Sequence, residues 1–231
     1  MVGAWGAARV ARWTGVLGIL IPTIGLIVYP IWSFPGTRTS GADIASWAAA
    51  HHGRLVVTML FYTIGVTLWL AFGAALWSYL RDHLPAGSTL AAGFGAGLIG
   101  FVTLLLAGFT AFDLLLYRLP EGSTATLLYD LAFGLLAMSG MPTALSLASF
   151  GVAVYRQGIL PRVTAHLAAA TAAAHVLLLV GFIAHAGPLS LEGFSITGIP
   201  ALLRAWILTT ALSMPREAVE PDPSTPRLVR K

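Results

Sequence analysis

The sequence predicts an all-α protein: a polytopic membrane bundle of six transmembrane helices, with both termini in the cytoplasm and one short external helix at the membrane interface. Composition supports this fold class. Hydrophobic residues make up 57% of the 231 residues and charged residues only 10%, whereas a typical soluble domain has about 25% charged residues. A soluble fold of this length buries too little surface to hide so many apolar side chains, so lipid is the expected solvent.

Six apolar segments provide a further observation, because each is close to the roughly 20 residues that a bilayer crossing requires. In hydrocarbon every backbone N–H and C=O must be paired within its own segment, so single runs of this length are helices. Turns rich in Pro and Gly separate them, as at Leu84-Pro85-Ala86-Gly87. The predicted spans are residues 14–33, 55–78, 90–117, 127–155, 164–186 and 196–214, which form one domain over residues 1–214.

The first span follows Arg9 and Arg12 and therefore has the layout of a signal peptide. Its apolar run is too long for that interpretation, because the apolar core of a signal peptide has about 7–15 residues. We expect a retained first helix. Pro22 lies inside it and should kink the helix, with Thr23 pairing a carbonyl that the proline leaves free.

The loop after the first span contains the expected external helix, residues 41–54 (GADIASWAAAHHGR). Asp43 lies near its start, where a carboxylate is favourable. Ile44, Trp47 and Ala48 share one face at helical spacing, so this helix is predicted to lie along the outer membrane surface.

The third span contains Gly95-Ala96-Gly97-Leu98-Ile99-Gly100, which matches the dinucleotide-binding pattern G-x-G-x-x-G. No strand precedes it, so the match is false in this context. Gly93 and Gly97, four residues apart, with Gly100 and Gly108, instead predict a surface for close helix packing. In the fourth span Pro142 predicts a second kink, with Ser139 and Thr143 as partners for the freed carbonyls.

Basic residues set the expected orientation. The N-terminus, the second and fourth loops and the tail carry Arg9, Arg12, Arg81, Arg156, Arg162, Arg216, Arg227, Arg230 and Lys231, whereas the other loops carry Arg38, Arg54 and Arg118. The positive-inside rule therefore places both termini in the cytoplasm, and the polar, Pro-rich residues 215–231 are predicted to form a disordered cytoplasmic tail. The chain has no Asn and a single Lys beside twelve Arg, a bias typical of GC-rich bacterial genomes, so a bacterial inner membrane is the expected location.

Four ionisable residues within the spans form a candidate intramembrane polar cluster: Arg204, Asp113, Asp130 and His185. Estimated depths place all four towards the outer surface, with the Arg204 side chain reaching outward. One interpretation is an outward-facing pocket in which Arg204 fixes an anionic group and the aspartates are partners or proton carriers. The other is a structural ion pair that locks the sixth helix to the third and fourth. The second is favoured, because buried pairs often serve packing and register alone.

His175, near the middle of the fifth span, is a candidate helix-gluing or ligand histidine. Hydrogen bonding across the bundle is the favoured role, because no second His at matching depth completes a haem or metal site. The chain has no Cys and no nucleophile elbow, P-loop or H-E-x-x-H motif. We therefore expect no catalytic residues, no metal, no cofactor and no nucleic-acid partner.

Two stretches resemble a family of uncharacterised six-helix integral membrane proteins of high-GC bacteria. The first is residues 42–81, with the junction His52-Gly53-Arg54-Leu55 and the exit Leu80-Arg81. The second is the turn at residues 155–162 (YRQGILPR), which is followed here by Val163 where the family often has Trp. The resemblance implies a six-helix bundle and carries over no catalytic residue.

Two classes of function follow. The first is a small transporter, a sensor or a lipid-site protein with a polar pocket in the outer leaflet. The second is a structural or accessory membrane subunit in which the buried charges are only an ion pair. A water-accessible cavity lined by charges would favour the first, and a dry core the second. Beyond the lipid bilayer, the partners left open are a small-molecule or lipid ligand, a second copy of the chain and another membrane protein.

Overall fold

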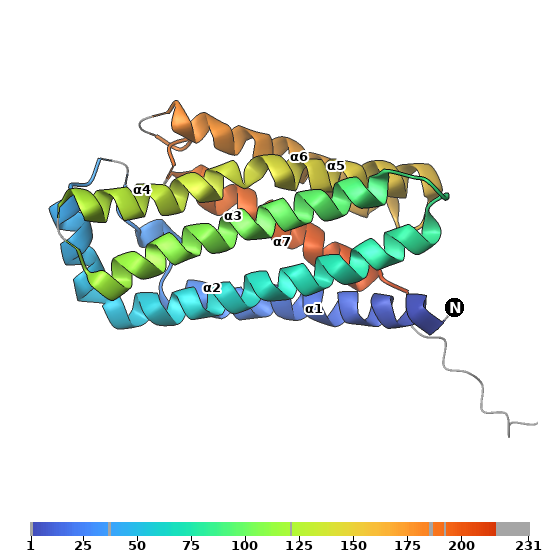
Figure 1. Cartoon of the computed structure of the whole chain (residues 1–231), viewed down its shortest axis with the longest axis horizontal. Helices are drawn as coiled ribbons and strands as arrows, with labels where there is room; N and C mark the ends of the chain where they lie inside the picture. The colour runs from blue at the N-terminus through green and yellow to red at the C-terminus, as the bar shows by residue number, and fades with distance from the viewer. Residues whose placement is uncertain (1, 37, 121, 185–186, 192, 216–231) are drawn as a thin grey trace, which may run out of the picture.

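The computed structural model describes residues 2–36, 38–120, 122–184, 187–191 and 193–215, and within these ranges the chain is all-helical with no strand. Figure 1 shows long helices lying side by side in a single bundle. The helices are α1 Val2–Val28, the 3₁₀ turn η1 Ile31–Ser33, α2 Gly41–His83, α3 Leu90–Arg118, α4 Ser123–Met138, α5 Gly140–Gln157, α6 Arg162–Val176, the 3₁₀ helix η2 Leu177–Phe182 and α7 Phe194–Ser213.

The predicted all-α membrane bundle is confirmed at this level. Five helical stretches are long and apolar enough to cross a membrane, and residues Gly198–Ser213 form a shorter apolar helix. Large apolar side chains are exposed on the outside of the bundle, where lipid would solvate them, including Leu20, Leu60, Ile99, Leu127, Leu145, Val176 and Leu212. The expected tail lies outside the described residues after Pro215.

Two predicted spans depart locally from a regular α-helix. Residues 127–155 were expected as one helix kinked by Pro142, and they lie in one helical stretch, Ser123–Gln157, that is interrupted at Ser139 into α4 and α5. Pro142 explains the break, because it has no N–H to bond back one turn. Ser139 and Thr143 were expected to pair the carbonyl that Pro142 frees, that of Met138, but their hydroxyls donate to the carbonyls of Leu136 (2.6 Å) and Ser139 (2.7 Å) instead. The fifth span also changes its helix type, from α6 to the tighter η2.

Pro22 lies inside α1, as expected, but the carbonyl that it frees is paired from another helix. Pro22 removes the bond that the Gly18 carbonyl would accept, and the Trp69 indole N–H of α2 donates to that carbonyl at 2.7 Å. Thr23, the expected partner, donates to Ile19 at 2.8 Å instead. Gly65 of α2 allows that helix to pack closely against Pro22, because a Cβ at position 65 would lie 1.9 Å from the Pro22 ring.

Gly93, Gly97 and Gly100 of α3 face α5 and Gly108 faces α4, which confirms their predicted packing role. A Cβ on Gly97 would lie 2.5 Å from the carbonyl oxygen of Pro142, and a Cβ on Gly108 would lie 2.9 Å from that of Ala132. The close approach also lets Ser146 donate to the Phe94 carbonyl at 2.9 Å. Small residues therefore let the helix backbones pack closely here, as is typical of membrane bundles.

Residues 41–54 are helical, as predicted, but they do not form a separate helix. They run without a break into α2, which spans Gly41–His83. In Figure 1 the first part of α2, in blue, crosses the end of the bundle, and the cyan remainder runs along it. The predicted apolar face packs on protein, since Ile44 and Ala48 are buried and Trp47 donates to the Tyr29 hydroxyl at 2.8 Å.

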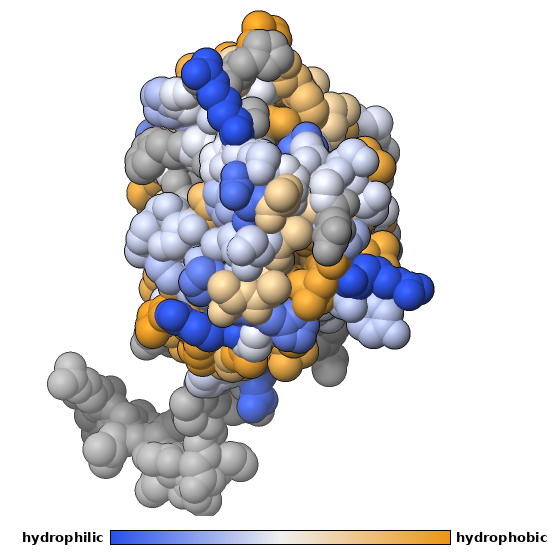
Figure 2. Space-filling model, turned by 90° about the vertical axis from the view of Figure 1, so that its left-hand side faces the viewer, coloured by the Kyte–Doolittle hydropathy of each residue, from blue (hydrophilic) through white to orange (hydrophobic). Residues whose placement is uncertain are grey.

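The N-terminus and the end of α7 lie at the same end of the bundle (Figure 1). Arg12 of α1 donates a hydrogen bond to the Met214 carbonyl, which ties these two segments together. Figure 2 looks onto the opposite end, which carries η1 and the α3–α4 turn. Weakly polar residues cover much of this face, strongly hydrophilic side chains project at its edges, and hydrophobic patches lie among them and along the margin, as expected for a surface at the boundary between water and lipid.

Candidate ligand pocket around Arg204

A cavity of about 130 Å³ lies inside the bundle, where helices from the whole length of the chain converge. It is large enough for about ten water-sized groups, since one water needs roughly 10–15 Å³ of such volume. The cavity reaches the surface at η1, because Trp32 lines it and is 69% exposed. Its walls are formed by Pro22, Leu26, Ile31, Trp32, Tyr62, Val66, Trp69, Phe101, Leu105, Phe109, Leu136, Ser139, His175, Leu178, Pro200, Leu203 and Arg204.

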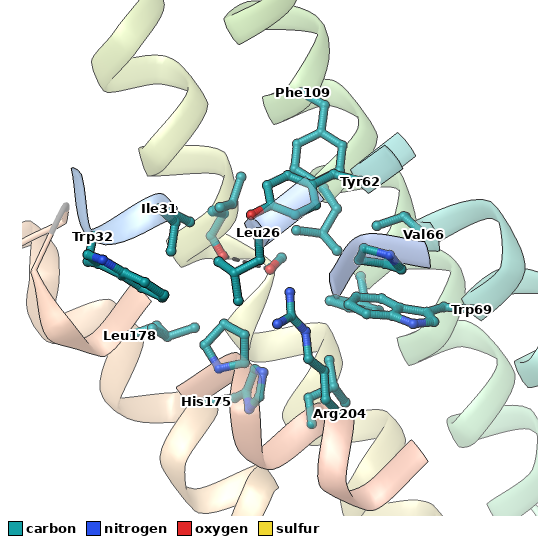
Figure 3. Close-up of a pocket in the computed structure, with 17 residues that line it drawn as sticks. Leu26, Ile31, Trp32, Tyr62, Val66, Trp69, Phe109, His175, Leu178 and Arg204 are labelled. Carbon is teal, nitrogen blue, oxygen red and sulfur yellow. Dashed lines mark hydrogen bonds between the residues drawn. The ribbon is translucent and has the colours of Figure 1, made fainter. Parts of the chain in front are cut away.

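Arg204 is the charged residue of this wall. Figure 3 shows its guanidinium projecting from α7 into the middle of the pocket. Its Nε is buried and has no hydrogen-bond partner among the described residues. An arginine near the bilayer centre costs about 2.5–3.5 kcal/mol on insertion scales, and such residues are normally paired or solvated. The unpaired guanidinium therefore marks a place for a complementary negative group.

Tyr62 of α2 and His175 of α6 add polar atoms to the same pocket. The Tyr62 hydroxyl is buried and lacks a hydrogen-bond partner in the described part of the chain, and it lies near enough to Arg204 for an electrostatic interaction. His175 is only 2% exposed. Its Nδ1 lies 2.8 Å from the Thr171 carbonyl, so Nδ1 carries the proton and Nε2 is an acceptor in the neutral ring.

Apolar and aromatic groups make up most of the remaining wall. The Trp69 and Phe101 rings stack with centroids 6.0 Å apart, and the Tyr62 and Phe109 rings stack at 6.2 Å. Because the Trp69 N–H is already bonded to Gly18, it adds no free donor to the pocket. A few convergent polar groups within an apolar wall are typical of small-molecule sites.

The structure does not bring together the predicted polar cluster, so the expected ion pair is wrong. Asp113 and Asp130 are exposed on α3 and α4, and neither lines the pocket of Arg204. The neighbours of Asp113 on the inward face of α3, Phe112 and Leu116, are buried instead. Position along the chain indicates the depth of these residues but not the side of the helix that faces inward. His185 lies outside the described residues.

His175 is buried within the bundle, and the bond from its ring to Thr171 stays within α6. Within the described part of the chain, His175 therefore forms no hydrogen bond to another helix. Among the described residues, no group of three or more His, Cys, Asp or Glu is arranged to hold a metal ion. His175 lies instead in the pocket wall, beside the guanidinium of Arg204 (Figure 3).

Sequence reasoning missed Tyr62 and Trp69 as pocket residues. They lie seven residues apart on α2, two helical turns, and both face the core. That spacing is also typical of any buried helix face, so it gives no sign of a pocket. Only the approach of α7 to α2 places Tyr62 opposite Arg204. Comparison of the chain with known protein families, with curated proteins and with solved structures gives no match.

Proposed function

We propose that this protein binds the negatively charged head of a small amphiphilic molecule in the Arg204 pocket, within a bacterial inner membrane and with both termini in the cytoplasm. It is thus a lipid-site protein, a sensor or a small transporter. The proposal rests on one observation: a guanidinium projects into a largely apolar cavity, and no acidic side chain among the described residues lines that cavity. Binding an anion there would compensate the cost of the buried charge.

The hydrogen-bonding groups of the pocket support the same chemistry. Arginine presents N–H donors in a fixed fork that matches a carboxylate or phosphate. The Tyr62 hydroxyl is a further donor with no partner among the described residues. Such a head, held by Arg204 and Tyr62, would place the apolar part of the molecule against the aromatic wall.

The distribution of basic residues supports the proposed orientation. The end of the bundle that holds the N-terminus carries Arg9, Arg12, Arg81, Arg156 and Arg162, and the opposite end carries Arg38, Arg54 and Arg118. Positive residues are retained on the cytoplasmic side of membrane proteins. The pocket mouth at η1 would then face the outer leaflet.

The test compares octanoate with octanol, a neutral molecule with a chain of the same length. The protein is purified in a neutral maltoside detergent, and its unfolding midpoint is followed as each probe is added. We expect octanoate to raise the midpoint in the wild type, because a ligand that binds only the folded state stabilises it. Octanol should have a much smaller effect.

Two variants complete the test. Arg204→Met should lose the octanoate response, whereas Arg118→Met, which removes an exposed arginine at the mouth end of the bundle, should keep it. An equal octanoate response in Arg204→Met and the wild type would show that the guanidinium does not bind the anion, and the proposed function would then be wrong.

A further inference from the structure

We infer that the ligand is a monoanionic amphiphile with one unbranched chain of medium length, whose tail extends from the Arg204 pocket into a second, apolar cavity between α2, α3 and α4. This inference rests on the proposed function and deepens it by naming the class of ligand. The second cavity measures about 30 Å³ and shares Ile31, Tyr62, Phe109 and Leu136 with the first. The two spaces are therefore adjacent, with the stacked rings of Tyr62 and Phe109 lining both.

The lining of the second cavity suits a hydrocarbon chain. Apart from Tyr62, which it shares with the Arg204 pocket, its walls are apolar and include Met59, Phe112 and Ala132. A third cavity of about 20 Å³ adjoins the Arg204 pocket at Trp69 and Phe101. That cavity is lined partly by Thr143, Ser146 and Trp206, and the Trp206 N–H is buried without a partner among the described residues. Because the Thr143 and Ser146 hydroxyls are already hydrogen-bonded, the two cavities differ mainly in size, and the larger second cavity is the better match for a tail.

The volumes set the size of the ligand. With roughly 10–15 Å³ for each water-sized group, the first cavity of about 130 Å³ and the second of about 30 Å³ hold about a dozen such groups. A methylene is close to a water in size, so a carboxylate head with a chain of roughly 8–12 carbons fills the space. The two long chains of a phospholipid would exceed this enclosed volume.

The charge sets the head group. Arg204 provides one positive charge, and His175, with Nδ1 bonded to Thr171 and only 2% exposed, is held as a neutral ring. A single negative charge therefore balances the site, as in a fatty-acid carboxylate. The Tyr62 hydroxyl can donate to that carboxylate, and His175 Nε2 can accept a hydrogen bond from a water.

The experiment measures binding of saturated carboxylic acids from hexanoate to hexadecanoate to the full chain in neutral detergent. Concentrations are expressed relative to total detergent, so that partitioning into the micelle cancels. We expect affinity to peak at roughly 8–12 carbons. Hexadecanoate should bind about tenfold more weakly, because an oversized chain must displace packed side chains. A dimyristoyl phosphatidate competitor should not displace the preferred acid.

Two large-to-alanine variants locate the tail. Met59→Ala enlarges the second cavity and should move the preferred length about two carbons upward, because a cavity gains the volume of the removed side chain. Leu98→Ala enlarges the third cavity and should leave the preferred length unchanged. Both side chains are buried, so both variants should lose stability. Leu98→Ala therefore controls for the effect of lost stability on binding by Met59→Ala.

The outcomes separate this inference from the proposed function. A length preference that moves with Leu98→Ala but not with Met59→Ala overturns the tail position. Equal affinity for all chain lengths, or displacement by the two-chain phosphatidate, overturns the ligand class. In each case an octanoate response that depends on Arg204 would leave the proposed anion site in place.

Discussion

Trp69 of α2 donates its indole N–H to the Gly18 carbonyl of α1 at 2.7 Å, and that carbonyl is the one left without its helical partner by Pro22. The missing hydrogen bond of one helix is thus replaced by a side chain of another. This bond fixes α1 against α2 at the wall of the Arg204 pocket, where both Pro22 and Trp69 lie.

The hydrogen bond from Trp69 to the Gly18 carbonyl should contribute more to the free energy of unfolding when residue 22 is proline than when it is alanine. Trp69→Phe should lower the free energy of unfolding by about 1–3 kcal/mol, because the buried Gly18 carbonyl loses its donor. In a Pro22→Ala background the backbone regains an N–H that can bond to that carbonyl, so the same change should cost less. A double-mutant cycle in detergent measures the difference. If Trp69→Phe lowered stability equally in both backgrounds, the Trp69 bond would not be a substitute for the helical bond that Pro22 removes.

Two buried glycines two residues apart on α3 should respond in opposite ways to alanine. A Cβ on Gly97 overlaps the backbone of α5, with the Pro142 carbonyl oxygen at 2.5 Å, so Gly97→Ala should destabilise the fold by about 1–3 kcal/mol. Gly95→Ala is the matched control, because its Cβ would lie 3.6 Å from the Trp77 ring, an ordinary contact. It should be neutral or slightly stabilising, given the higher helix propensity of alanine. Unfolding midpoints in detergent distinguish the two.

Arg204→Met should not destabilise the ligand-free protein. The variant removes a buried charge without a partner among the described residues and keeps an apolar side chain of similar length, so we expect a gain of about 1–3 kcal/mol. Asp113→Asn and Asp130→Asn should show no coupling to it beyond about 0.5 kcal/mol, since neither aspartate lines the pocket of Arg204. Denaturation of the three single and two double variants provides the measurement. A clear loss of stability in Arg204→Met would revive the ion-pair interpretation.

Arg54 should stabilise the join between α1 and α2. Its Nε and Nη2 donate to the Val28 carbonyl at 3.0 and 2.7 Å, and its guanidinium lies 5.2 Å from the centre of the Tyr29 ring. Arg54→Met should cost about 1 kcal/mol of stability. Arg38→Met, which removes an exposed arginine in the loop before α2, is the control and should cost little. Thermal unfolding in a neutral detergent compares the two, and equal losses would show a general effect of charge.

The proposed orientation can be tested by labelling single cysteines, because the native chain has none. Gln157 and His52 are exposed at opposite ends of the bundle. In intact cells an impermeant thiol reagent should label His52→Cys and leave Gln157→Cys unlabelled until the membrane is opened. The reverse pattern would place both termini outside.

Composition and apolar run lengths were enough to predict the helical bundle, since both follow from the needs of a chain in hydrocarbon. The packing role of Gly97 was also predictable, because close approach of helix backbones requires a small residue. The hydrogen-bond partner of the Gly18 carbonyl could not be predicted, because Trp69 lies 51 residues away on another helix. A pocket at Arg204 was one of the two interpretations of the sequence, but its lining was missed for the same reason: the residues around Arg204 depend on helix rotation, which depth along the chain does not give.

The short segment that carries Trp32 is held on both sides by side chains of other helices. Before it, Arg54 holds the Val28 carbonyl, and after it the Tyr129 hydroxyl donates to the Pro35 carbonyl at 2.7 Å. The segment that lines the opening of the cavity therefore lies between two carbonyls, those of Val28 and Pro35, that accept hydrogen bonds from other helices and are only seven residues apart. The position of this segment beside the cavity is thus set by its contacts with α2 and α4 and not by the loop alone.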